Sequence, residues 1–314
     1  MTLYLKLVPA MVTTCVLATS SLSAQSLPYP GAGPYPPAGD TPGNVSISAS
    51  DSRIVEWAST VVSYLPGKDV IPDPTGNGTE PYPTYNNSAL ALGPADCTYN
   101  DPYEVVSLGD GGSITLGFAK PITNGPGTDF AVYTNKFKKS DGVPNDYFLE
   151  LAYVAVSSDG VNFFTFPSVS LTQTTTQVGG FGLLDPTNIY DLAGKDISGY
   201  GTPFSLQELA GISPLLDVNH IIQIRITDVV GSINPTYASY DSKGNIINAP
   251  YPTPFGSSGF SLDAIAVLSD TDTYPVTDTP TMPPVALLIM ALLLLLAARQ
   301  THQSNSSDFR TFLT

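Results

Sequence analysis

Residues 149–166 read LELAYVAVSSDGVNFFTF, and this stretch decides the fold class. Apolar and polar side chains alternate from Leu149 to Ser157, and aromatic residues follow from Phe163 to Phe166. Alternation of this kind is typical of a half-buried strand. The turn signal Ser158-Asp159-Gly160 separates the two runs, and Asp-Gly is suited to tight turns because glycine adopts positive φ at little cost. The stretch therefore predicts an antiparallel β-hairpin.

Short runs of the same kind, bounded by turn residues, recur through residues 104–268. We expect further strands at Glu104–Leu108, Ser113–Phe118, Phe130–Asn135, His220–Val229 and Phe260–Leu268. A short helix is expected at residues 205–209, where Ser205 and Glu208 have the spacing of a capping box. About seven strands with one short helix predict an all-β fold: an antiparallel two-sheet β-sandwich of jelly-roll type.

The composition agrees with many short strands joined by turns. Only 12% of the 314 residues are charged, whereas the chain has 27 glycines and 29 prolines, which disfavours long helices. The formal net charge of −15 disfavours a nucleic-acid partner, because binding to a phosphate backbone needs a basic face. The same charge suits an extracellular surface and leaves carboxylates available for Ca²⁺.

Both ends of the chain differ in composition from the middle. Residues 1–24 are expected to be a signal peptide, with Lys6 before an apolar run and cleavage after Ala24. Residues 25–43 are rich in Pro, Gly and Tyr and predict an extended spacer that is largely unpacked. The predicted β-domain occupies residues 44–269. Within it, apolar residues between Ile54 and Leu65 fit a helical stripe.

A second apolar segment, at residues 285–298, follows a linker at 270–284 and precedes a polar tail at 299–314. As a helix it would span about 21 Å, against about 30 Å for the hydrocarbon core of a membrane. It is interpreted as a marginal membrane anchor or a processed sorting tail. The acidic stretch before it and Arg299 and Arg310 after it favour an outward-facing β-domain.

Few residues offer catalytic or metal chemistry. With the signal peptide removed, Cys97 is the only cysteine, so neither an internal disulfide nor a cysteine-based metal cluster is expected. His220 and His302 are the only histidines, and no G-x-S-x-G motif accompanies them, which disfavours a hydrolytic triad. Paired carboxylates could still perform glycoside hydrolysis. We expect no enzymatic activity and keep a carboxylate-dependent glycosidase as the weakest alternative.

Three carboxylates, Glu150, Asp228 and Asp263, lie within predicted strands among apolar neighbours. Strict alternation places Asp263 on the same face as Ile265 and Val267 and predicts partial burial. A buried carboxylate needs a partner. Two kinds of partner remain open for these three: Arg225 or backbone N–H groups, or a structural Ca²⁺.

Aromatic residues in loops are the second set of candidate ligand-binding residues. Sugar-binding sandwiches stack pyranose rings on exposed aromatic side chains, and such platforms are built on loops. Five tyrosines fall in predicted loops and form the candidate glycan-binding set: Tyr190, Tyr200, Tyr237, Tyr240 and Tyr251.

Six ordered blocks show a resemblance to a known family. They read VSLGDGGSITLGF (106–118), DFAVYTNKF (129–137), FLELAYVAVSSDGVNFFTFP (148–167), DLAGKDISGYGTPFSLQEL (191–209), IRITDVVGS (224–232) and PTPFGSSGFSLDAIAVL (252–268). Over residues 91–268 the chain resembles a family of bacterial exported cell-surface proteins that often end in a PEP-CTERM sorting signal. Here Met282-Pro283-Pro284 stands where that signal has Pro-Glu-Pro. The resemblance implies export and surface display but no ligand.

These observations predict an exported, non-enzymatic cell-surface protein, bound to the membrane through its C-terminal helix. The β-sandwich is expected to bind extracellular glycans. The main alternative is a structural component of the envelope or matrix, whose sandwich packs against its neighbours.

Overall fold

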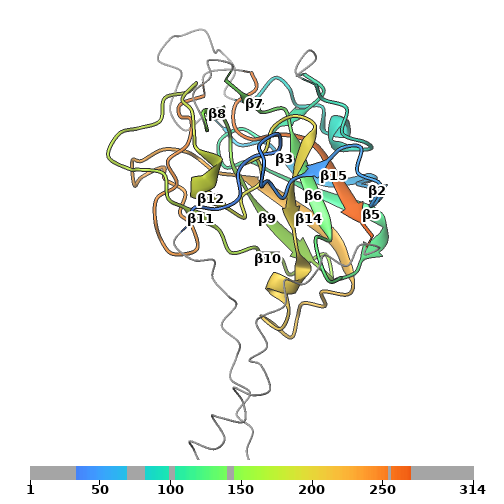
Figure 1. The fold of residues 1–314 in the computed structure, drawn as a ribbon. Coiled ribbons are helices and arrows are strands. Elements are labelled where there is room, and N and C mark those ends of the chain that lie inside the picture. Colours follow the sequence, from blue (N-terminus) through green and yellow to red (C-terminus); the bar gives the residue numbers. More distant parts are fainter. Residues whose placement is uncertain (1–32, 69–81, 99–102, 140–144, 254–255, 270–314) are drawn as a thin grey trace, which may run out of the picture.

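The computed structural model describes residues 33–68, 82–98, 103–139, 145–253 and 256–269. These residues form an all-β fold (Figure 1). All the strand pairs in this part of the chain are antiparallel, and its only helices are short 3₁₀ turns. The predicted all-β antiparallel class is therefore confirmed. The predicted terminal helices lie outside the described residues.

The first sheet has the strand order β1-β13-β6-β15-β2, and β4 also pairs with β15. Its strands are β1 (Ile47–Ser48), β13 (Tyr200–Phe204), β6 (Phe130–Thr134), β15 (Ser261–Leu268), β2 (Ile54–Trp57) and β4 (Val106–Ser107). β15 is buried at every position, in agreement with its almost uninterrupted apolar sequence.

The second sheet has the order β10-β9-β14-β5-β3. Its strands are β10 (Phe164–Thr165), β9 (Ala152–Ser157), β14 (Ile221–Asp228), β5 (Ser113–Ile122) and β3 (Thr60–Leu65). β9 and β10 pair with Phe164 opposite Val156, which confirms the hairpin predicted from residues 149–166. Gly160 in the turn has a φ of 76°, the conformation for which glycine is favoured.

Two further pairs of short strands and three 3₁₀ helices complete the fold. The pairs are β7 (Phe137–Lys138) with β8 (Tyr147–Phe148), and β11 (Val169–Ser170) with β12 (Ile189–Tyr190). The 3₁₀ helices are η1 (Ser88–Ala91), η2 (Pro186–Asn188) and η3 (Leu206–Leu209). In Figure 1, β7 and β8 lie at the upper end of the molecule, away from β10.

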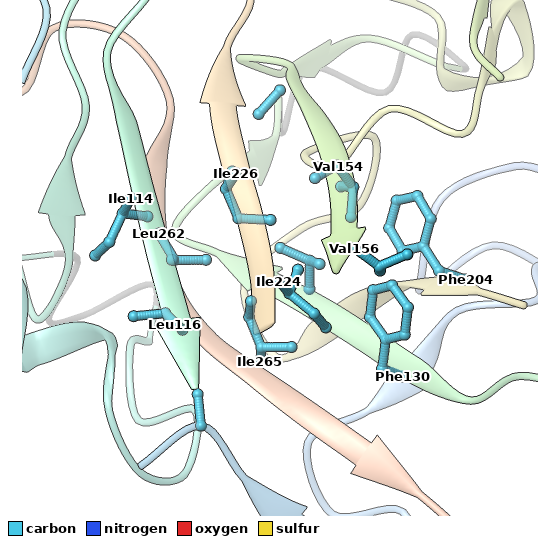
Figure 2. Packing of buried hydrophobic residues seen from close by; sticks show 14 of the residues in the cluster. Ile114, Leu116, Phe130, Val154, Val156, Phe204, Ile224, Ile226, Leu262 and Ile265 are labelled. Carbon is cyan, nitrogen blue, oxygen red and sulfur yellow. The ribbon is translucent and has the colours of Figure 1, made fainter. Parts of the chain in front are cut away.

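The largest hydrophobic core contains buried side chains from both sheets. Figure 2 shows Ile224 and Ile226 of β14 among residues of β5, β9 and the first sheet. Phe130 and Phe204 stack with ring centroids 5.3 Å apart, and Phe166 meets both rings edge-on. The shared core explains why the inward positions of strands in both sheets are apolar.

A second cluster lies beneath the loops around β8 and β12. Its buried side chains include Tyr147, Leu149, Leu184, Ile189 and Ile247. Ala38 belongs to the same cluster and is fully buried, and Lys195 Nζ donates a hydrogen bond to the Pro36 carbonyl. The prediction of a largely unpacked spacer at 25–43 is therefore wrong at Tyr35, Ala38 and Gly39, which are buried against the domain, whereas five of the eleven residues from 33 to 43 are exposed.

Two helical predictions also need correction. The helical stripe at residues 54–65 is instead the two strands β2 and β3, which pair with β15 and β5 respectively; β-branched residues fit a pleated surface, and pairing with existing sheets decides the outcome. The helix expected at 205–209 exists as η3, but the Ser205 side chain makes no capping hydrogen bond. Glu208 instead accepts from the hydroxyl of Tyr190 at 2.9 Å.

Candidate functional site

A pocket of about 400 Å³ lies beside β7 and β8. We call it the aromatic pocket. Its lining consists of Tyr85, Tyr103, Val105, Asn135, Lys136, Phe137, Phe148, Glu150, Phe181 and Ser257. The volume lies within the usual range for small-ligand sites, and an apolar lining with a few polar groups is typical of such sites.

Aromatic rings form two groups in this lining. Tyr85 and Tyr103 stack with centroids 5.5 Å apart and an angle of 13° between their planes. Phe137 stacks on Phe148 at 5.3 Å, and Phe148 contacts Phe181 at 5.9 Å. Tyr103 and Phe181 are 59% and 68% exposed. Exposed rings of this size inside a pocket favour contact with a ligand, since they leave apolar surface in water.

The polar part of the lining is a buried ion pair. Lys136 Nζ donates to Glu150 Oε2, and the two residues are only 3% and 6% exposed. The Lys136 ammonium also lies 5.3 Å from the centre of the Phe148 ring. Burial raises the pKa of the Glu150 carboxyl, and the positive charge of Lys136 opposes that rise.

Local pairing explains how this site forms. Phe137 and Phe148 are register partners in the β7–β8 pair, and therefore their rings stack across the two strands. Lys136 comes one residue before Phe137, and Glu150 comes two residues after Phe148, so both lie just beyond the end of this strand pair, where their side chains bond. This pocket was not predicted from the sequence. The sequence did contain one indication of it: aromatic residues, Phe137 and Tyr147-Phe148, stand on either side of a segment rich in turn residues, as in a hairpin with stacked rings.

The five predicted tyrosines differ in their local structure and exposure. None of them lines the aromatic pocket. Tyr190 and Tyr200 lie on strands β12 and β13 rather than in loops, and Tyr251 is buried. Tyr237 is partly buried, and Tyr240 is 45% exposed. Glycan binding by this set stays a prediction, and the structure offers a different set of rings.

Glu150 and Asp228 line a second, very small cavity of about 10 Å³, but Asp263 does not. Asp228 accepts hydrogen bonds from the backbone N–H groups of Phe260 and Gly111, at 2.6 and 2.9 Å. Burial raises its pKa well above the usual range, and these two N–H groups oppose the rise. Arg225 was predicted as a partner of the buried carboxylates, but it donates to Thr115 and lies over the Phe163 ring.

Asp263 departs from strict alternation because β15 has an irregularity between Leu262 and Ala264 in its pairing with β6. Leu262 and Ile265 both belong to the core between the sheets, whereas Ala264 packs on the outer face of the first sheet. The prediction that Asp263 shares a face with Ile265 is therefore wrong, since a bulge shifts the side-chain phase by one residue. Asp263 Oδ1 accepts from the N–H groups of Asp96 and Cys97, at 3.3 and 3.5 Å.

Lys136 thus bonds to Glu150, and backbone N–H groups bond to Asp228 and Asp263. Of the two kinds of partner left open by the sequence, backbone N–H groups therefore describe Asp228 and Asp263. Within the described ranges, no cluster of three or more His, Cys, Asp or Glu side chains has an arrangement that could hold a metal ion. A structural Ca²⁺ at Glu150, Asp228 or Asp263 stays a prediction.

In the part of the chain that the structure describes, no helix has the length and apolar character needed to cross a membrane. The segment 285–298 lies outside that part.

No protein-family model matches the chain, and a search of curated proteins finds no match.

Proposed function

We propose that this chain is an exported cell-surface protein whose β-domain binds a glycan without chemically altering it. The observation that supports this proposal most directly is the aromatic pocket, where stacked and exposed rings lie next to a polar pair. The C–H faces of a pyranose ring pack against aromatic rings, while its hydroxyl groups need hydrogen-bond partners. The pocket offers both kinds of group within about 400 Å³.

A binding role is favoured over glycoside hydrolysis by the carboxylates of this pocket. Glycosidases use two carboxyl groups on opposite sides of the scissile bond. Among the described residues that line the pocket, Glu150 is the only one with a carboxyl group. Lys136 already engages that carboxylate, and a general acid or nucleophile would need it to be available.

For the architecture, we propose a two-sheet sandwich of jelly-roll type. It is supported by one hydrophobic core with side chains from both antiparallel sheets. In sandwiches of this kind the ends of the sheets are open to loops, and the loops are common sites of binding. The position of β7 and β8 at one end of the molecule is consistent with this arrangement (Figure 1).

For localisation, we propose export through the signal peptide at 1–24 and surface display through the segment at 285–298. The charge-free apolar segment and the basic residues after it support this proposal. Deleting residues 285–298 should release the protein into the medium of the expressing cells. Retention of the shortened protein in the membrane fraction would contradict the anchoring role.

A structural role in the envelope is the second candidate, and exposed apolar side chains on β2 and β3 favour it. Val55, Val62 and Leu65 are 61%, 48% and 65% exposed. β2 and β3 are the terminal strands of their sheets, and terminal strands with apolar side chains can pair with a neighbouring molecule. This role predicts self-association of the purified protein at micromolar concentration.

The glycan proposal is tested by screening the purified full chain on a glycan array, with and without Ca²⁺. Three variants accompany the wild type: Phe181→Ala in the pocket, Tyr240→Ala from the predicted tyrosine set, and Leu215→Ala as an exposed control. Binding that only Phe181→Ala abolishes would support the aromatic pocket. Binding that only Tyr240→Ala abolishes would place the site on the tyrosine set instead. An array without any binding would favour the structural role.

A further inference from the structure

The charged groups of the aromatic pocket form an internally neutral pair. Lys136 and Glu150 are both almost fully buried and bonded to each other. No other described residue of the lining has a charged side chain. The charged groups of this lining therefore have a net charge of zero, with one donor group beside one acceptor group, and its other polar residues, Asn135, Ser257, Tyr85 and Tyr103, are neutral side chains.

This arrangement suits hydroxyl groups. An ammonium has three N–H donors, and a carboxylate has about four acceptor positions, so one bond between them leaves further capacity on both. A hydroxyl group donates and accepts at the same time. Two adjacent hydroxyls of a pyranose can accept from Lys136 and donate to Glu150 without breaking the bond between these side chains.

A charged ligand would disturb the pair. The carboxylate of a uronic acid would compete with Glu150 for Lys136 and would leave a buried carboxylate without its counter-charge, which is costly. The ammonium of an amino sugar would compete with Lys136 in the same way. Anionic glycans are also repelled at longer range, because the chain has a net charge of −15.

The aromatic walls set a second requirement. The Tyr85–Tyr103 stack and the three phenylalanines present ring faces and edges, and the two tyrosine hydroxyls are the only hydrogen-bonding groups on these side chains. Such walls favour a ligand with an extended C–H face, and they gain most from a ring that is not strongly hydrated. Neutral hexopyranoses meet both requirements, whereas ionised sugars lose hydration on entry.

We infer that the aromatic pocket selects neutral hexopyranose units and discriminates against uronic acids and N-unsubstituted amino sugars. This inference rests on the proposed glycan-binding function and specifies its ligand class. Lys136 and Glu150 are the specificity-determining residues, and Tyr103 and Phe181 provide the stacking surface.

The test is isothermal titration calorimetry of the full chain with three oligosaccharide probes of equal length, built from glucose, glucuronic acid and glucosamine. We expect at least tenfold tighter binding of the neutral probe at pH 7. Phe181→Ala should weaken its binding at least tenfold, and Leu215→Ala should leave it unchanged. Equal or tighter binding of a charged probe, still sensitive to Phe181→Ala, would overturn the selectivity while leaving glycan binding intact. Absence of binding of all three probes would instead contradict glycan binding by this pocket.

The variant Glu150→Gln tests the role of the pair. It keeps the shape of the side chain but leaves the Lys136 charge unbalanced, so the preference for the neutral probe over the glucuronic acid probe should fall at least fivefold. Circular dichroism checks that the variant is folded. If Glu150→Gln does not fold, the selectivity of the wild type among the three probes tests the inference by itself. An unchanged preference in folded Glu150→Gln would contradict the role of the pair.

Discussion

Asp228 Oδ1 accepts a hydrogen bond of 2.6 Å from the backbone N–H of Phe260. Asp228 is the last residue of β14 in the second sheet, and Phe260 directly precedes β15 in the first sheet. The other oxygen of Asp228 accepts from Gly111 N at 2.9 Å, in the turn before β5. One buried carboxylate therefore joins the ends of both sheets and satisfies two backbone donors.

The first prediction concerns this contact. Asp228→Ala should lower the free energy of unfolding by about 1–3 kcal/mol, because the N–H of the buried Phe260 loses its acceptor, whereas the N–H of the exposed Gly111 can bind water instead. At pH 4, where the raised pKa keeps the Asp228 carboxyl protonated, Asp228→Asn retains one acceptor oxygen and should lie between the wild type and the alanine variant. Asp217→Ala, at an exposed acidic residue, is the control and should cost less than about 1 kcal/mol. Urea denaturation measures all three, and wild-type stability in Asp228→Ala would show that water replaces the carboxylate.

The second prediction is a pH dependence at Asp263. Burial raises the pKa of this carboxyl from 3.8 to about 7, while the N–H groups of Asp96 and Cys97 oppose the rise. The folded protein therefore binds the proton more tightly than the unfolded chain does. The stabilisation is complete below pH 4 and is lost as the pH rises through 7. A rise from 3.8 to about 7 corresponds to about 4 kcal/mol.

Asp263→Asn isolates this effect from the other buried acids, such as Asp228 and Glu150, whose pKa values are also raised. The amide keeps one acceptor oxygen and never ionises. The variant should be more stable than the wild type at pH 8, and this advantage should disappear at pH 4. Thermal unfolding between pH 4 and pH 8 measures the difference. Parallel curves for the two proteins would mean that Asp263 does not titrate in this range.

The third prediction concerns the hydrophobic core to which both sheets contribute side chains. Ile226 on the central strand β14 is fully buried, with neighbours from both sheets in the same cluster. Ile226→Ala should cost about 2–5 kcal/mol, because the deletion removes buried apolar surface and leaves a cavity. Val161→Ala is the matched control, since Val161 is 79% exposed and should change stability by less than about 0.5 kcal/mol. Similar losses in both variants would contradict the shared core.

The fourth prediction compares two glycines of similar conformation. Gly194 and Gly199 have φ values of 86° and 83°. A Cβ atom on Gly194 would lie 2.0 Å from the Glu150 carbonyl oxygen, whereas a Cβ on Gly199 would meet nothing within 4 Å. Gly199→Ala should therefore cost only the conformational penalty of about 1–2 kcal/mol.

Gly194→Ala adds a backbone clash and should cost at least about 2 kcal/mol more than Gly199→Ala. Because the clash is with the Glu150 carbonyl oxygen, a folded Gly194→Ala variant should also displace Glu150 in the lining of the aromatic pocket and weaken ligand binding. Urea denaturation of the pair measures the difference in stability. Equal stability of the two variants would mean that the loop around Gly194 moves aside without cost.

Much of the strand set was predictable because its pattern is local. Apolar and polar side chains alternate in the run that ends at Ser157 and in the strand at Ile221–Asp228, and the run that ends at Leu268 is mostly apolar. These patterns indicate half-buried or fully buried strands. β13 was not predicted, although it pairs with both β1 and β6. Its sequence YGTPF contains Gly201 and Pro203, which locally disfavour a strand, and only the neighbouring strands of the sheet stabilise it.

The candidate site was less predictable, since its parts are far apart in the sequence. Tyr85 and Phe181 approach Glu150 only when the loops fold over the β7–β8 pair. The partner of Glu150 was also missed, because Lys136 is 14 residues away in the sequence and meets Glu150 only beyond the end of the folded β7–β8 pair.

Local patterns in the sequence were sufficient for the antiparallel β class and for seven of the fifteen strands of the described residues, because side-chain alternation and Asp-Gly turns act over a few residues and need no distant partner. Only the tertiary structure decided which strands share a sheet, where the bulge turns Asp263 away from the core, and how Lys136 meets Glu150 among aromatic rings. These features depend on register and on packing between segments up to a hundred residues or more apart, and those contacts become favourable only when the chain has folded.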